Sequence, residues 1–137
     1  MLNFNGFERV YQTLVTELKK YDENIEVATT AEGTNLPLVV VEDIDYRSVN
    51  RTYGGIESYS SLSVQVNIYA RQKRIKNVTL SGRKIAHDIA CEVDDILTNK
   101  LGMNRTSSRS LSTMDESIYR YVMIYEVLQN DSKNYFI

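Results

Sequence analysis

The stretch SLSVQVNIYA, residues 61–70, alternates between apolar and more polar residues without a break. A period of two is typical of a β-strand whose two faces meet different surroundings. A helical pattern follows, in which apolar residues recur at spacings of three and four from Leu80 to Leu97 and form one stripe. Residues 118–128 again have the composition of a strand. The order strand, long helix and strand predicts a small α/β unit.

The N-terminal third adds a helix and two strands to this unit. Apolar residues at helical spacing predict a helix over 5–21, with Lys19 and Lys20 in its last turn, where cations favour the helix dipole. A short strand is expected within 24–29, and a second over 38–44, directly after the only proline, Pro37. The whole pattern predicts an α/β (α+β) fold: a mixed, mostly antiparallel β-sheet packed by two main helices.

Length and composition predict a single domain over residues 1–137, because 42% hydrophobic residues suffice for one core. Long loops are expected near 45–59 and 102–116, and a short C-terminal tail over 129–137. The first loop is either a long hairpin or a mobile arm, and the second is a loop or a weak edge strand. Thr79 or Ser81 is expected to cap the long helix, and Gly102 to end it.

Charge and cysteine content exclude several function classes. With 16 basic and 18 acidic residues the net charge is −2, which argues against a surface built for polyanions. No apolar run is long enough to span a membrane, so no membrane partner is expected. The single cysteine, Cys91, cannot form an internal disulfide and is expected to be a small buried side chain of the long helix.

The chain offers little catalytic or metal-binding chemistry. His87 is the only histidine, and Asp94 and Asp95 are adjacent on a helix, so they point in different directions and are expected on a solvated face. An acidic cluster near the first loop lacks the calcium-loop signature; it consists of Glu42, Asp43, Asp45 and Glu57. We therefore expect no enzyme, no cofactor and no metal.

The last predicted strand is apolar on both faces. One face carries Ile118, Arg120, Val122, Ile124 and Glu126, and the other carries Tyr119, Tyr121, Met123, Tyr125 and Val127. Either the two helices cover opposite faces of the sheet, or a neighbouring subunit buries the tyrosine row, which we define as Tyr119, Tyr121 and Tyr125. Ten tyrosines and no tryptophan favour the second alternative, since tyrosine suits interfaces.

The order of these segments resembles a family of phage proteins. The segments LPLVVVEDID, ESYSSLSVQVNIYA, KNVTLSGRKIAHDIACEVDDILTNKLGM and IYRYVMIYEV, preceded by an amphipathic helix, are similar to the tail terminator and tail completion (head-tail joining) proteins of long-tailed bacteriophages and prophages. The resemblance covers almost the entire chain. Its motifs are hydrophobic patterns with a few polar positions, and head-closure proteins share much of this layout.

The resemblance implies a structural virion protein that forms a ring, usually hexameric, at the head-proximal end of the tail tube. Such a ring ends tube polymerisation and provides the surface for head attachment. Its implied partners are further copies of itself, the tail tube protein and, in contractile tails, the sheath protein, with a head-completion protein above and DNA passing through without specific binding. The implied location is the virion tail, with assembly in the host bacterial cytoplasm.

Two groups of residues are candidates for subunit or tube contacts. The tyrosine row is the candidate for a face buried between subunits, and the first loop is the candidate for contact with a neighbour or the tube through Arg47, Arg51 and Tyr53. Segments 107–114 and 135–137 are second choices. The alternatives are a head-closure or adaptor protein of the head-tail connector and, in a different class, a small ligand-binding regulatory domain with a cavity lined by the tyrosines.

Overall fold

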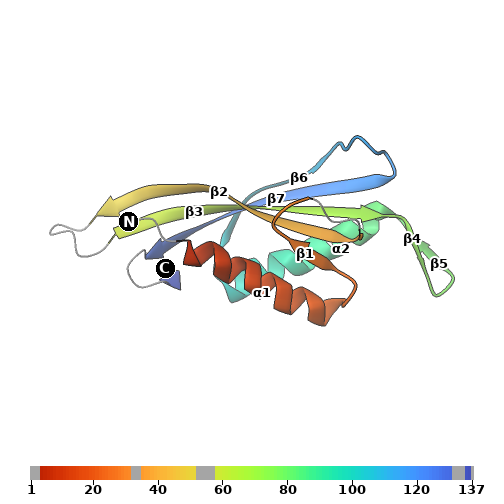
Figure 1. The fold of residues 1–137 in the computed structure, drawn as a ribbon, viewed down its shortest axis with the longest axis horizontal. Coiled ribbons are helices and arrows are strands. Elements are labelled where there is room, and N and C mark those ends of the chain that lie inside the picture. The colour runs from red at the N-terminus through yellow and green to blue at the C-terminus, as the bar shows by residue number, and fades with distance from the viewer. Residues whose placement is uncertain (1–3, 32–34, 52–57, 131–134, 137) are drawn as a thin grey trace.

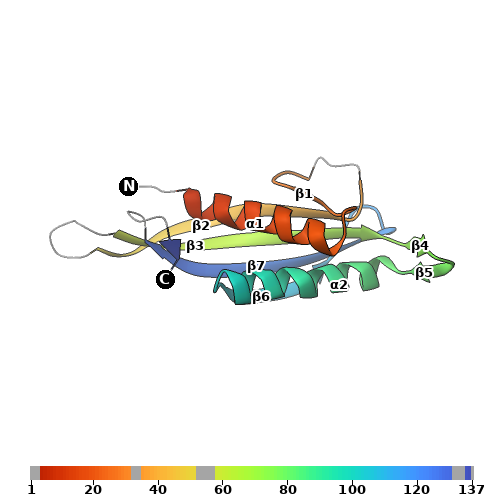
Figure 2. The ribbon, with the colours of Figure 1, turned by 90° about the horizontal axis from the view of Figure 1, so that it is seen from below.

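Two helices lie on the same face of a long β-sheet (Figures 1 and 2). The computed structural model describes residues 4–31, 35–51, 58–130 and 135–136. Its elements are α1 (Asn5–Tyr21), β1 (Glu26–Ala28), β2 (Leu38–Arg51), β3 (Ser58–Arg71), β4 (Lys73–Ile75), β5 (Val78–Leu80), α2 (Gly82–Asp95), the π-helical turn η1 (Ile96–Lys100), β6 (Asn104–Leu111), β7 (Ile118–Asn130) and β8 (Tyr135–Phe136).

The main sheet has the strand order β1-β2-β3-β7-β6, and β8 adds to one end of β7. The pair β1 and β2 is parallel, whereas all other pairs are antiparallel. Strands β4 and β5 form a separate small hairpin before α2. The prediction of a mixed, mostly antiparallel sheet packed by two helices in a single domain is confirmed.

The core lies between the sheet and the two helices. Strand β3 occupies the centre of the sheet, and the apolar half of its alternating pattern is fully buried against the helices. These strand residues are Leu62, Val64, Val66, Ile68 and Ala70. The helices contribute Phe7, Val10, Leu14 and Leu18 from α1 and Ala86, Ile89, Ala90 and Val93 from α2. Both stripes therefore meet the same face of the sheet.

The ends of α2 follow the sequence signals. The Ser81 side chain accepts a hydrogen bond of 3.1 Å from the backbone N–H of Lys84, which satisfies a donor that the first turn leaves free. After η1 the chain turns at Gly102, whose φ of 67° is disfavoured for residues with a Cβ. The predicted cap and helix end are both confirmed.

The long loops of the prediction are largely strands. Residues 45–51 and 58–59 extend β2 and β3, so the hairpin alternative is correct as far as the structure describes it. The segment 102–116 contains β6, an edge strand paired with β7, and Gln129 and Asn130 of the expected tail belong to β7. Polar side chains suggested loops in these segments, but pairing to a neighbouring strand satisfies their backbone hydrogen bonds equally well.

Candidate interface surfaces

The tyrosine row faces α2, so the chain itself covers it. The hydroxyl of Tyr119 lies 3.0 Å from Nε2 of His87, and the Tyr121 ring meets the His87 ring edge to face at a centroid distance of 5.2 Å. Tyr125 is fully buried in the core. The assignment of Tyr125 to a subunit interface is therefore wrong, because both helices pack on the face that carries the tyrosines. Tyr119 and Tyr121 remain half-buried at the margin of α2.

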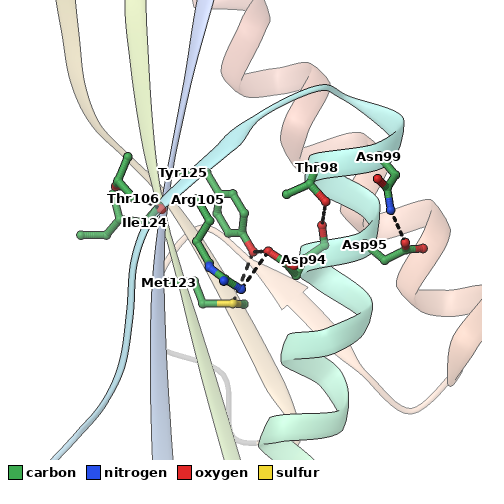
Figure 3. A network of polar contacts seen from close by, with 9 residues as sticks. All are labelled: Asp94, Asp95, Thr98, Asn99, Arg105, Thr106, Met123, Ile124 and Tyr125. Atoms are coloured by element: carbon green, nitrogen blue, oxygen red, sulfur yellow. Dashed lines mark hydrogen bonds and ion pairs between the residues drawn. The ribbon is translucent and has the colours of Figure 1, made fainter.

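A polar network joins α2 to strands β6 and β7 at Asp94 (Figure 3). The Tyr125 hydroxyl donates a hydrogen bond of 2.7 Å to Oδ1 of Asp94, and Nη1 of Arg105 lies 3.3 Å from the same oxygen. Burial, followed by the hydrogen bond to this carboxylate, raises the pKa of Tyr125 far above its ordinary value. Asp94 was expected on a solvated face, and no local pattern in the sequence identifies its partners.

A cavity of about 270 Å³ lies beside this network, between α2 and the strands β6 and β7. It is lined by His87, Ala90, Cys91, Asp94, Arg105, Tyr121 and Met123. Cys91 is exposed here, which contradicts the prediction of a buried cysteine: the apolar stripe of α2 points toward the sheet and leaves this position outside it. Within the described ranges, no three His, Cys, Asp or Glu side chains are grouped so that they could hold a metal ion.

The opposite face of the sheet has no helix over it in the described part of the chain (Figure 1). This helix-free face includes the β7 side chains that alternate with the tyrosine row, from Ile118 to Glu126. One face of β7 therefore has no helix over it, but that face does not carry the tyrosines. The idea that the helices cover opposite faces is also wrong. Val122 on the helix-free face is only 4% exposed, while Ile124 is half-buried.

A polar cluster occupies the centre of the helix-free face. Arg120 donates to Oδ1 of Asn67 through Nε at 3.2 Å and Nη2 at 2.7 Å, and its guanidinium lies 5.6 Å from the centre of the Tyr69 ring. Gln65 donates a third hydrogen bond to the same oxygen, at 3.3 Å. The long side chains thus lie over a fully buried Asn67, so this face is more polar than the strand pattern suggested.

The long ribbon of β2 and β3 extends past the N-terminal end of α1 (Figure 1). Arg47 is exposed on this ribbon, and its guanidinium lies 3.3 Å from the Asp45 carboxylate. Arg51 ends β2, and Tyr53 lies outside the described residues. Of the three candidates in the first loop, the structure therefore places Arg47 and the backbone of Arg51 on one projecting strand.

The two second-choice segments differ in what they leave accessible. Residues 107–111 belong to β6, whereas Met114 in the connection to β7 is fully exposed. Phe136 packs against the core, and the Arg9 guanidinium lies 5.1 Å from the centre of its ring. Phe136 is thus already in contact with the chain itself, and Ile137 lies outside the described residues.

Comparison with protein-family models gave no match, and comparison with curated proteins gave none either. Neither α1 nor α2, nor any other helical segment in the described ranges, has both the length and the apolar content that crossing a bilayer requires.

Proposed function

We propose that this protein is a subunit of a ring that caps the head-proximal end of a phage tail tube, ends tube polymerisation and offers the surface for head attachment. The observation that carries the proposal is the order of elements along almost the whole chain. That order resembles the tail terminator and tail completion proteins, and the fold it builds is the two-helix, mixed-sheet domain that the resemblance implies.

The shape of the domain suits such a role. A ring subunit has to contact a neighbour on each side and the tube below it. The helices bury one face of the sheet and leave the other free in the described part of the chain, and the β2–β3 ribbon reaches beyond the helical layer (Figure 1). We assign contact with the tube to this ribbon, on which Arg47 and Arg51 lie in β2, and to Tyr53, which lies outside the described residues. The role is structural, so we expect no catalysed reaction and no cofactor.

Electron microscopy of the protein mixed with tail tubes tests the proposal. Tubes polymerised from the tail tube protein of the encoding phage or prophage should carry a ring at one end and stop growing when the protein is added. Light scattering over a range of concentrations should show a monomer or labile oligomer that assembles further at high concentration or on tubes. A chain that stays strictly monomeric and never labels tube ends would contradict the proposal.

A charge reversal on the ribbon tests the assignment of the tube contact. Arg47→Glu should reduce the labelling of tube ends while leaving the far-ultraviolet circular dichroism unchanged, because Arg47 is exposed. The matched control is Arg74→Glu in the exposed β4–β5 hairpin, which changes the net charge by the same amount. Equal labelling by both variants would place the tube contact elsewhere.

The cavity between α2 and β6 favours a second candidate, a ligand-binding regulatory domain. Its volume of about 270 Å³ and its mixture of imidazole, carboxylate and guanidinium groups could receive a small polar molecule. This alternative predicts saturable binding that His87→Ala weakens, and a chain that forms no rings. Thermal-shift screening with small metabolites, followed by calorimetry, distinguishes the two candidates.

A further inference from the structure

Both outer edges of the main sheet carry unpaired strand in the described part of the chain. β6 pairs with β7 on one side only, and no described strand lies on its other side. β1 pairs with β2 only at Leu38, Val39 and Val40, so β2 has a free outer edge from Val41 onward. An unpaired edge presents a row of backbone donors and acceptors that can extend a sheet into another chain.

The two edges run in opposite directions. Successive antiparallel pairs link β2 to β3, β3 to β7 and β7 to β6, so β6 is antiparallel to β2. A second copy placed beside the first in the same orientation would therefore bring its β2 antiparallel to β6. The antiparallel ladder would continue from one copy into the next without reversing any subunit.

The edges also carry opposite charges. Strand β6 contains Arg105 and Arg109 and no acidic residue, whereas the first half of the free part of β2 carries three acidic residues, Glu42, Asp43 and Asp45, and its two arginines, Arg47 and Arg51, follow only in the outer half. Arg109 lies opposite Val122, and Glu42 lies opposite Gln65, so both side chains belong to the helix-free face. Neither Arg109 nor Glu42 has an ion-pair partner among the described residues.

These charges select one mode of association among three. Pairing β6 with β6, or β2 with β2, would be a two-fold contact that brings like charges together, which is unfavourable. Pairing β6 with β2 of another copy joins opposite charges and is a head-to-tail contact, which leaves a free edge at each end of the pair. A head-to-tail contact can close only by forming a ring.

We infer that the basic edge β6 of one copy pairs with the acidic segment 42–45 of β2 in the next, so that the sheet continues around the ring while the outer half of β2 stays available to the tube. The inference deepens the proposed function and rests on it, because it names the contact between ring subunits. A contact limited to the eight residues of β6 is small, which fits an oligomer that forms at high concentration or on a tube and dissociates on dilution.

A charge-swap series tests this contact. The single variants Arg109→Glu and Glu42→Arg each bring like charges together at every subunit boundary, and each should weaken ring association by about tenfold or more. The double variant restores opposite charges with reversed polarity and should recover ring formation. Arg74→Glu and Glu23→Arg change exposed residues away from both edges by the same charges and serve as matched controls. Circular dichroism confirms folding, and sedimentation velocity with electron microscopy measures rings.

The outcomes separate the two proposals. Rings that form equally well in both single variants would overturn the edge contact and leave the tail-capping role standing. Loss in the single variants without recovery in the double variant, or the appearance of closed dimers in place of rings, would also overturn the edge contact. Absence of rings in the unmodified protein, alone and on tubes, would overturn both.

Discussion

Replacing Tyr125 by phenylalanine should destabilise the folded chain without affecting association between copies. The substitution keeps the fully buried ring and removes only the hydroxyl that donates a 2.7 Å hydrogen bond to Asp94. The carboxylate loses one partner but keeps Arg105, and its side chain is 33% exposed, so solvent can replace part of the lost interaction.

The size of the effect follows from the charge on the acceptor. A hydrogen bond to a charged group contributes about 1.5–3 kcal/mol to stability, and partial solvent access to Asp94 places this one near the lower end, at about 1.5 kcal/mol. For a domain of this size such a loss corresponds to a decrease in Tm of about 5 °C. Ring association should stay the same, because Tyr125 has no exposed surface for a neighbouring copy to contact.

Urea unfolding at neutral pH, followed by circular dichroism, measures the loss. The midpoint should fall while the dependence on urea concentration stays the same, since the area exposed on unfolding hardly changes. Tyr21→Phe is the control: Tyr21 is 46% exposed on α1, and its substitution should alter the unfolding free energy by less than about 0.5 kcal/mol. A Tyr125→Phe change as small as the control would refute the network at Asp94.

A double-mutant cycle with Asp94→Asn isolates the interaction between the two side chains. If the hydroxyl and the carboxylate act as a pair, the double variant should lose less stability than the sum of the two single losses. Additive losses would show that Tyr125 and Asp94 stabilise the fold independently.

Two further predictions concern the ends of the helices. Ser81→Ala removes the side-chain acceptor at the start of α2 and should cost about 1 kcal/mol in urea unfolding; an unchanged midpoint would show that this cap is dispensable. The hydrogen bond from Lys100, at 2.7 Å, lowers the pKa of Glu17 below its ordinary value of 4.5. The ionised Glu17 therefore stabilises the folded state at pH values above 4.5, and this stabilisation is lost as the pH falls through the lowered pKa. The urea midpoints of the unmodified chain and Glu17→Gln should therefore differ at neutral pH and converge in acid, and a constant difference at all pH values would contradict the assignment.

Local sequence signals predicted the individual elements well where periodicity is strong. The bounds of α1 agree with the pattern of apolar residues over 5–21, and Ser81 and Gly102 have the capping and ending roles expected of them. The alternation over residues 61–70 lies within β3, where it separates the helix-covered face from the helix-free face. Such signals depend on a few neighbouring residues, so they can be recognised without knowledge of distant contacts.

Segments rich in polar residues were harder to predict. The sequence left two alternatives open for each of these segments, a loop or a weak edge strand for the region of β6 and a long hairpin or a mobile arm for the outer half of β2. The edge strand and, as far as the structure describes it, the hairpin are correct, because an edge strand needs only one paired side and little burial. The exposure of Cys91 and the burial of Tyr125 were missed for a related reason, since both depend on where α2 lies over the sheet.

The sequence by itself therefore determined the two helices, the central strand and the mixed-sheet class of this protein. Only the tertiary structure decided that both helices share one face of the sheet, that Asp94 meets Tyr125 and Arg105, and that β6 and the outer part of β2 each have one unpaired side among the described residues. Periodicity shows which side of a helix or strand is apolar, but it does not show which other element packs against that side. The choice among them is made by packing and by hydrogen bonds between residues that are far apart in the chain.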